Sequence, residues 1–366
     1  SNKTSTDNFP FSIWAKLIRE TISTKSEELM TTPPCGGIWE LREAICHHLK
    51  DFRNMAVTPA QIIIGAGTEY LYGLLIQLLG FDKKYATENP GYQKLTKVYD
   101  SYHVSHHAIP MDQEGIQIES LVASGADIAH ISPSHHYPTG IVTSIKRRYD
   151  LLHWASQDAN RYIIEDDYDS EFRYRGKPIP ALQGLDKNDK VIYIGTFSKS
   201  IAPGLRMSYM VLPESLMDSY ISVGKRYSNT VSRIDQNIVN LFIKEGYYER
   251  HLNRMRGIYK AKHDVLLGEL KKFGAEYRIA GESAGLHVLL STDKMPEDEL
   301  VLRAAQYGVR VYPLSEHFLG EDIEYDIRKL TGKRSTIILG YARLNEDEIV
   351  RGTKILMEAF SNEKDM

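Results

Sequence analysis

The sequence predicts an α/β protein with a large domain on a mostly parallel sheet and a second, smaller α+β domain. Short β-branched runs alternate with helical stretches through the middle of the chain, as expected for strands buried on both faces of a sheet. After about residue 250 the pattern changes to a long charged helix followed by a shorter series of strands and helices. The length of 366 residues leaves room for two domains.

The expected elements of the large domain are two helices and five strands. Helices with an apolar stripe at helical spacing cover residues 38–49 and 68–79. Strands are expected at five short apolar runs, which are 62–64, 129–131, 162–164, 191–194 and 207–212. The second domain is expected to begin with a helix over 251–273 and to continue through the segments 284–291, 297–307 and 336–360.

The composition excludes several classes of protein. Lys and Arg number 45 against 48 Asp and Glu, and a net charge of −3 gives no basic field for coating nucleic acid. Cys35 and Cys46 are too few for a disulfide framework, which favours a reducing compartment and a packing role for both. No apolar run has membrane-spanning length and no signal peptide is evident, so we expect a cytoplasmic protein with no membrane partner. The start at Ser1-Asn2 suggests a piece of a longer protein.

Paired histidines do not predict a metal site. They occur at 47–48, 106–107 and 135–136. Neighbouring residues on a helix or strand point in different directions and therefore chelate one ion poorly. We expect no bound metal.

The first chemical motif is a lysine at the end of a strand. Lys199 follows the small hydroxyl residues Thr196 and Ser198, and Arg206 stands seven positions further on. Such a lysine can form an imine while the hydroxyls and the guanidinium hold a phosphate, which is what pyridoxal 5′-phosphate (PLP) requires. Alone the pattern is weak, because most lysines beside a serine are solvated surface residues.

A second motif places carboxylates at the end of another strand. Asp166 can pair with the pyridine nitrogen of the cofactor, and Tyr168 can donate to its 3′ oxygen. The alternative is a metal-binding acidic cluster or an ordinary acidic loop, in which Asp167 and Asp169 are solvated. No glycine-spaced calcium loop or histidine pair at ligand spacing accompanies the acidic residues.

A glycine turn and an aromatic residue complete the pattern. Gly67, Thr68 and Glu69 lie between a strand and a helix, where backbone N–H groups can cradle a phosphate. Tyr92 follows a Pro-Gly turn, and its ring could stack on a cofactor. Each has an ordinary alternative, since glycine turns before helices are common and Tyr92 is one of 23 tyrosines.

Together and in this order, the motifs resemble the fold-type I, aspartate-aminotransferase-like PLP proteins. More narrowly, the chain resembles the aminotransferase-like domain of MocR-type (GabR-like) regulators of the GntR family. The segments that carry this resemblance are FPFSIWAKLIRE, PPCGGIWELREAICHHL, ENPGY, SPSHHYPTG, EDDYDSEFRY, GTFSKSIAPGLR, AGLH and LGYARL. In such regulators a winged helix-turn-helix domain comes first, and we presume that it has been removed from this chain. We expect an N-terminal arm and small-domain segment over 1–50, a large PLP-binding domain over 51–255 and a small α+β domain over 256–366.

The resemblance implies the roles of individual residues. Lys199 would form the internal aldimine, with Asp166 on the ring nitrogen and Tyr168 on the ring oxygen. The other implied cofactor contacts are Gly67, Thr68, Glu69, Tyr92, His135, Tyr137, Thr196, Ser198 and Arg206. One position departs from ordinary transaminases, which have Asn where this chain has Tyr137. Because Tyr137 has no amide donor, efficient transamination is in doubt.

Three functions remain open. The first is an effector sensor, in which a primary amine or amino acid forms an external aldimine with PLP. The second is a stand-alone aminotransferase, and the third is an interaction module without PLP, which the intact Lys199, Asp166 and Arg206 argue against. Candidate effector contacts are Arg310, Arg343 and Glu316, with Arg328 and His317 as further possibilities. By analogy we expect a homodimer that reaches DNA only through a domain absent from this chain.

Overall fold

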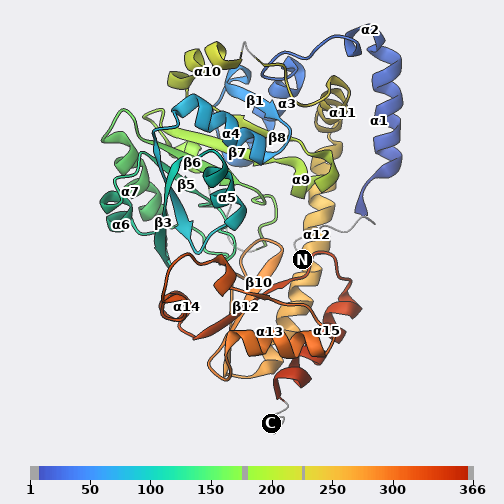
Figure 1. Ribbon diagram of the computed structural model, residues 1–366. Coiled ribbons are helices and arrows are strands. Elements are labelled where there is room, and N and C mark those ends of the chain that lie inside the picture. The colour runs from blue at the N-terminus through green and yellow to red at the C-terminus, as the bar shows by residue number, and fades with distance from the viewer. Residues whose placement is uncertain (1–7, 175–179, 225–226, 362–366) are drawn as a thin grey trace.

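The computed structural model describes residues 8–174, 180–224 and 227–361. Its large domain is built on an eight-stranded sheet with the order β1-β8-β7-β6-β5-β2-β3-β4 (Figure 1). The strands are β1 (Ile62–Gly65), β2 (Lys84–Asn89), β3 (Ser105–Asp112), β4 (Gly115–Ile116), β5 (Ile128–Ile131), β6 (Tyr162–Asp167), β7 (Val191–Thr196) and β8 (Ser208–Val211). Neighbours from β7 through β6, β5 and β2 to β3 are parallel, whereas β8 is antiparallel to both β7 and β1. The predicted fold class and the five predicted strands are confirmed.

Helices cover both faces of this sheet. Ile62 and Ile64 of β1 pack in the core cluster with α3 (Trp39–Arg53), and Ile63 packs on the opposite face with α4 (Thr68–Leu79). This alternation explains the continuous apolar run of the strand, because both of its faces are buried. The remaining helices of the domain are α5 (Gln93–Ser101), α6 (Ile118–Ala123), α7 (Ile145–Ser156), α8 (Leu182–Leu185), α9 (Phe197–Ser200), α10 (Met217–Gly224) and α11 (Arg233–Lys244).

The N-terminal segment belongs with the large domain. Helix α1 (Phe11–Thr24) lies beside α11, followed by α2 (Ser26–Leu29). Leu41 and Ile45 of α3 are fully buried in the same core as Ile62. Among the residues the structure describes, the apolar stripe of α3 packs on the large sheet, whereas the expected small-domain segment within 1–50 and the other domain bounds stay predictions. Residues 1–7 and 362–366, at the outer ends of the predicted domains, lie outside the described residues.

The small domain follows a long connecting helix, α12 (Tyr247–Leu270). Its first half places Tyr248 and Leu252 in the core of the large domain, and its last turns place Leu267 and Leu270 in the core of the small one. The small sheet has the order β11-β12-β10-β9 and is antiparallel throughout. Its elements are β9 (Tyr277–Ala280), β10 (His287–Thr292), α13 (Glu297–Gln306), β11 (Tyr312–Pro313), α14 (Ile323–Thr331), β12 (Ser335–Gly340) and α15 (Glu346–Ser361).

This topology brings four strand ends to one edge of the large sheet. Strands β2, β5, β6 and β7 are parallel, so their carboxyl ends point the same way, as ligand sites of open α/β sheets require. Among the helices of the described residues, none has the length and apolar character needed to cross a membrane.

Candidate functional site

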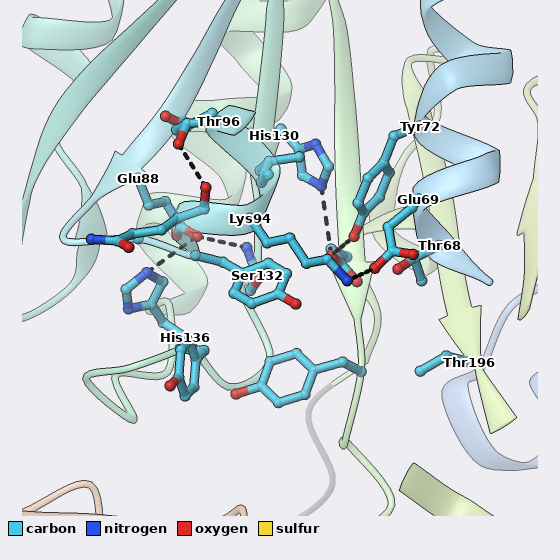
Figure 2. A pocket seen from close by; sticks show the side chains of 18 of the residues that line it. Thr68, Glu69, Tyr72, Glu88, Lys94, Thr96, His130, Ser132, His136 and Thr196 are labelled. Carbon is cyan, nitrogen blue, oxygen red and sulfur yellow. Dashed lines mark hydrogen bonds and ion pairs between the residues drawn. The ribbon is translucent and has the colours of Figure 1, made fainter. Parts of the chain in front are cut away.

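A cavity of about 340 Å³ lies at this edge of the sheet. Ten of the residues predicted to contact the cofactor line it, namely Thr68, Glu69, Tyr92, Tyr137, Asp166, Tyr168, Thr196, Ser198, Lys199 and Arg206. Figure 2 shows several of these side chains with their neighbours. Residues separated by more than a hundred positions in the sequence therefore meet around one space.

Lys199 is placed by a short turn at the end of β7. The Thr196 side chain accepts a hydrogen bond from the backbone N–H of Ser198 at 3.2 Å and thereby caps α9. Burial lowers the pKa of Lys199, because desolvation disfavours the ammonium form, and the carboxylate of Asp169 acts in the opposite direction. Burial thus favours the neutral amine, which is the nucleophilic form.

One pole of the cavity is built for an anion. Gly67 precedes α4 with φ +92°, a conformation that favours glycine, and its Cα side faces Arg206, because a Cβ there would lie 2.6 Å from Arg206 Nη2. The N-terminus of α4 begins at Thr68. Arg206 Nη2 donates to Glu69 Oε2 at 2.9 Å, and Lys94 also pairs with Glu69. The two cationic side chains and the helix N-terminus outweigh the single carboxylate, so this end of the cavity suits a phosphate.

Asp166 is held by two neighbours that sequence reasoning missed. Tyr72 Oη donates to Asp166 Oδ2 at 2.5 Å, and His130 Nε2 lies 3.7 Å from the same oxygen (Figure 2). The hydroxyl of Tyr99 contacts His130 Nδ1 at 2.6 Å. Tyr72 stands one helical turn after Thr68, and His130 interrupts an apolar strand, so both offered a signal in the sequence.

A second missed group forms the wall beside β2. The backbone N–H of Ser132 donates to Glu88 Oε2 at 2.8 Å, and His136 Nε2 lies 3.5 Å from that oxygen (Figure 2). Burial raises the pKa of Glu88 to about 8. Burial lowers the pKa of His136 to about 3, so its imidazole is neutral at physiological pH.

Aromatic rings line the remaining wall. The Tyr137 ring lies edge-on to Tyr92, with centroids 6.0 Å apart, and edge-on to His317 at 5.1 Å. Tyr137 therefore lines the cavity as a ring wall, and its phenol replaces the amide that an asparagine would have supplied. Burial raises the pKa of Tyr137 to about 12, which keeps the phenol protonated.

His135 is placed differently from the prediction. It is 2% exposed but does not line the cavity, whereas its neighbour His136 does. His135 Nδ1 lies 3.0 Å from both carboxylate oxygens of Asp169 and 3.1 Å from Tyr168 Oη, so it stands behind Tyr168. Adjacent residues point in different directions, so the sequence does not tell which of the two histidines faces the cavity, and a cofactor contact by His135 stays a prediction that this placement does not support.

The candidate effector residues lie outside the lining. Arg310, Glu316, Arg328 and Arg343 are all exposed, and none lines the cavity. The guanidinium of Arg310 instead lies over the Tyr312 ring, 5.1 Å from its centroid. From the segment that holds Glu316, the residues that line the cavity are His317 and Leu319.

The arrangement fits PLP group by group. A partly buried lysine can bind the aldehyde of PLP, and a carboxylate at a strand end can pair with its pyridine nitrogen. The glycine turn and Arg206 can bind its phosphate. Among the described residues, no three His, Cys, Asp or Glu side chains gather in a group that could hold a metal ion.

Comparisons with known proteins agree with this fit. The family model "Aminotransferase class I and II" matches residues 1–323. The chain is 38% identical over 355 residues to the HTH-type transcriptional regulator YdeL of Bacillus subtilis, covering 96% of this chain and 74% of that protein. It is 31% identical over 355 residues to the probable rhizopine catabolism regulatory protein MocR of Rhizobium meliloti, covering 96% and 70%.

The fold has solved counterparts. The kynurenine aminotransferase of Pyrococcus horikoshii superposes with a TM-score of 0.84 at 24% identity, covering 100% of this chain and 91% of that one. Pyridoxal 5′-phosphate is the cofactor of the aminotransferase class I and II family. The chain belongs to the aminotransferase class I and II family, and within it to the aminotransferase-like domains of MocR-type transcriptional regulators.

Proposed function

We propose that this chain is the effector-sensing and dimerisation domain of a MocR-type regulator, with PLP on Lys199 and a primary amine or amino acid as effector. The observation that carries the proposal is the cavity itself. It joins a partly buried lysine of lowered pKa, a strand-end carboxylate and an anion-binding end, in a chain that is similar to HTH-type regulators.

Different residues would bind the different groups of PLP. When bound, PLP supplies an aldehyde that condenses reversibly with primary amines. Asp166, fixed by Tyr72, would hold a proton at the ring nitrogen. Arg206, Thr68 and the turn at Gly67 would hold the phosphate, and Lys199 would supply the amine with which an effector amine competes. Only an effector that favours one arrangement of the domain over another can act as a signal.

A stand-alone aminotransferase is the second candidate. The observation in its favour is that Lys199, with its lowered pKa, suits a general base for moving a proton from the substrate. Tyr137 argues for the sensor, because the amide donor found in transaminases is absent at this position.

Spectroscopy of the PLP-loaded chain separates the two. We expect candidate amines and amino acids to change its visible absorption persistently, without release of a 2-oxo acid. Steady 2-oxo acid production would favour the enzyme. Lys199→Ala should abolish the lysine-dependent absorption, and Lys260→Ala, on an exposed part of α12, serves as a control that should keep it. If wild-type protein and Lys199→Ala give the same spectrum with PLP, the assignment of Lys199 is wrong.

The dimer is part of the proposal. Large apolar side chains stay exposed on the N-terminal segment, where Phe11 is 65%, Met30 88% and Trp39 52% exposed. Such residues favour burial against a second copy. Sedimentation equilibrium should give a dimer, and the double change Met30→Asp and Trp39→Asp should weaken it.

DNA contact would come from another domain of the regulator. The cytoplasmic location stays a prediction.

A further inference from the structure

A buried pair behind the cavity engages Tyr168. His135 follows β5 in the chain, and Asp169 follows β6 one residue after Tyr168. Both side chains of the pair are nearly inaccessible, with His135 2% and Asp169 3% exposed. His135 Nδ1 is 3.0 Å from each Asp169 oxygen and 3.1 Å from Tyr168 Oη. One ring nitrogen therefore meets three oxygens of two side chains.

The chemistry of these groups determines where the protons lie. An ionised carboxylate only accepts hydrogen bonds, so an Nδ1 facing both of its oxygens must carry the proton. A protonated Nδ1 cannot accept from Tyr168, and the phenol hydrogen must turn elsewhere. Tyr168 lines the cavity, and burial holds its pKa well above the ordinary value, so the phenol keeps its proton.

The surroundings fix the imidazole in this position. Gly285, with φ +78°, approaches so closely that a Cβ would lie 1.9 Å from His135 Cε1. His135 Nε2 is buried and has no hydrogen-bond partner among the described residues, which suits an unprotonated nitrogen. Titratable groups near the cluster include His287, whose ring centroid is 5.5 Å from that of His135, Tyr137, whose ring centroid is 6.5 Å from that of Tyr168, and Lys199. Glu171, Tyr174 and Tyr341 also interact electrostatically with Asp169, and His136 with His135. Burial lowers the pKa of His287 to about 3, so it is neutral at physiological pH.

We propose that His135, held by Asp169, is a positioning residue that keeps the Tyr168 hydroxyl aimed into the cavity as a hydrogen-bond donor. This inference rests on the proposed cofactor site, in which Tyr168 donates to the 3′ oxygen of PLP. In this inference Tyr168 remains the hydrogen-bond donor, and the direction of its hydroxyl is controlled by His135, which does not line the cavity. Without His135, the Tyr168 hydroxyl could rotate away from the cavity, because the N–H group that occupies that side would be gone.

The first test reads the tautomer directly in the wild-type protein. In a spectrum of ¹⁵N-histidine-labelled protein without added PLP, assigned with His135→Asn, we expect a protonated Nδ1 and an unprotonated Nε2 for His135. A protonated Nε2 with a bare Nδ1 would overturn the inference. Because this measurement needs no cofactor, it is independent of the proposed function.

The second test uses the pH at which the visible absorption of the PLP-loaded protein changes. A hydrogen bond donated to an oxygen anion favours that anion, so its loss moves the midpoint to higher pH. We expect Tyr168→Phe and His135→Leu each to raise the midpoint by about one pH unit, the size of one such bond. His135→Asn, whose amide N–H can still donate to Asp169, should stay near wild type.

A double variant separates positioning from a structural effect. In the Tyr168→Phe background, His135→Leu should add no further shift, because both changes remove the same bond. His263→Gln is the matched control, since His263 is also fully buried beside an aspartate and a tyrosine, and it should leave the midpoint unchanged. An unshifted His135→Leu, or a fully additive double variant, would overturn the inference. If wild-type protein shows no Lys199-dependent absorption, the proposed function itself fails.

Discussion

In the proposed cofactor site Glu69 would compete with the phosphate for Arg206, so we predict that its removal strengthens PLP binding. Glu69 Oε2 accepts from Arg206 Nη2 at 2.9 Å, and its carboxylate also pairs with Lys94. The side chains of Arg206 and Glu69 are 54% and 35% exposed, so solvent screens the pair. An exposed pair of this kind contributes up to about 1 kcal/mol. Glu69→Gln removes that competition and should lower the PLP dissociation constant up to about fivefold.

Equilibrium titration followed by visible absorption measures this constant. The difference between Glu69→Gln and wild type should shrink as salt is raised to about 0.5 M, because screened charges interact over shorter distances. Glu299→Gln, which removes an exposed carboxylate paired with Arg303 on α13, is the matched control and should change nothing. Weaker PLP binding by Glu69→Gln would refute the reasoning, because it would mean that Glu69 holds Arg206 in place for the phosphate.

Three further changes test the packing around the site. Burial raises the pKa of Glu88 from 4.5 to about 8, so between these pH values the folded chain keeps a proton that the unfolded chain releases. The free energy of unfolding therefore falls as pH rises from about 4.5 to 8. Because each pKa unit corresponds to about 1.4 kcal/mol, Glu88→Gln should stabilise the protein by about 4 kcal/mol at pH 8 and by less than about 1 kcal/mol at pH 5, measured by urea unfolding. Arg53→Met leaves Asp167, now 2.9 Å from the guanidinium, buried without its ion pair and should cost about 3–5 kcal/mol in the same assay. Gly67→Ala places a Cβ 2.6 Å from Arg206 Nη2 at φ +92° and should weaken PLP binding about tenfold.

Matched controls exist for two of these changes. Lys294 pairs with Glu276 at the surface, and Lys294→Ala should cost less than about 1 kcal/mol. Gly274 has φ +89° with no atom near its ideal Cβ, so Gly274→Ala tests backbone strain alone and should leave PLP binding intact. A Glu88→Gln effect of equal size at pH 5 and pH 8 would contradict the raised pKa of Glu88.

Local patterns in the sequence predicted most of the framework. The helix expected over 68–79 matches α4 to the residue, because its leucines recur at helical spacing and Gly67 and Gly80 flank it. Lys199 and Asp166 meet in one cavity because Asp166 lies near the end of β6, Lys199 follows β7, and these parallel strands end at the same edge. Strand β3 escaped prediction, since it reads SHHAIPMD and has no continuous apolar run.

Contacts between distant segments could not be predicted in the same way. Tyr72 and Asp166 are 94 positions apart, and their hydrogen bond depends on how α4 lies across the sheet. Glu88 stood inside a recognised motif, yet its role follows from burial beside Ser132 and not from spacing. Exposed arginines such as Arg343 offered the right chemistry, but no pattern in the sequence tells which side of a loop a side chain occupies.

The departure at Tyr137 gains a physical meaning from this geometry. Its ring packs edge-on against Tyr92 and His317, so it shapes the cavity without offering an amide N–H. In the proposed cofactor site, hydrogen-bond donation to the ring oxygen of PLP would then depend on Tyr168, whose hydroxyl lies 3.1 Å from His135 Nδ1. In the proposed site the buried pair of His135 and Asp169, which does not line the cavity, would set the direction of the Tyr168 proton, and we expect a sensor and an aminotransferase to differ at this pair.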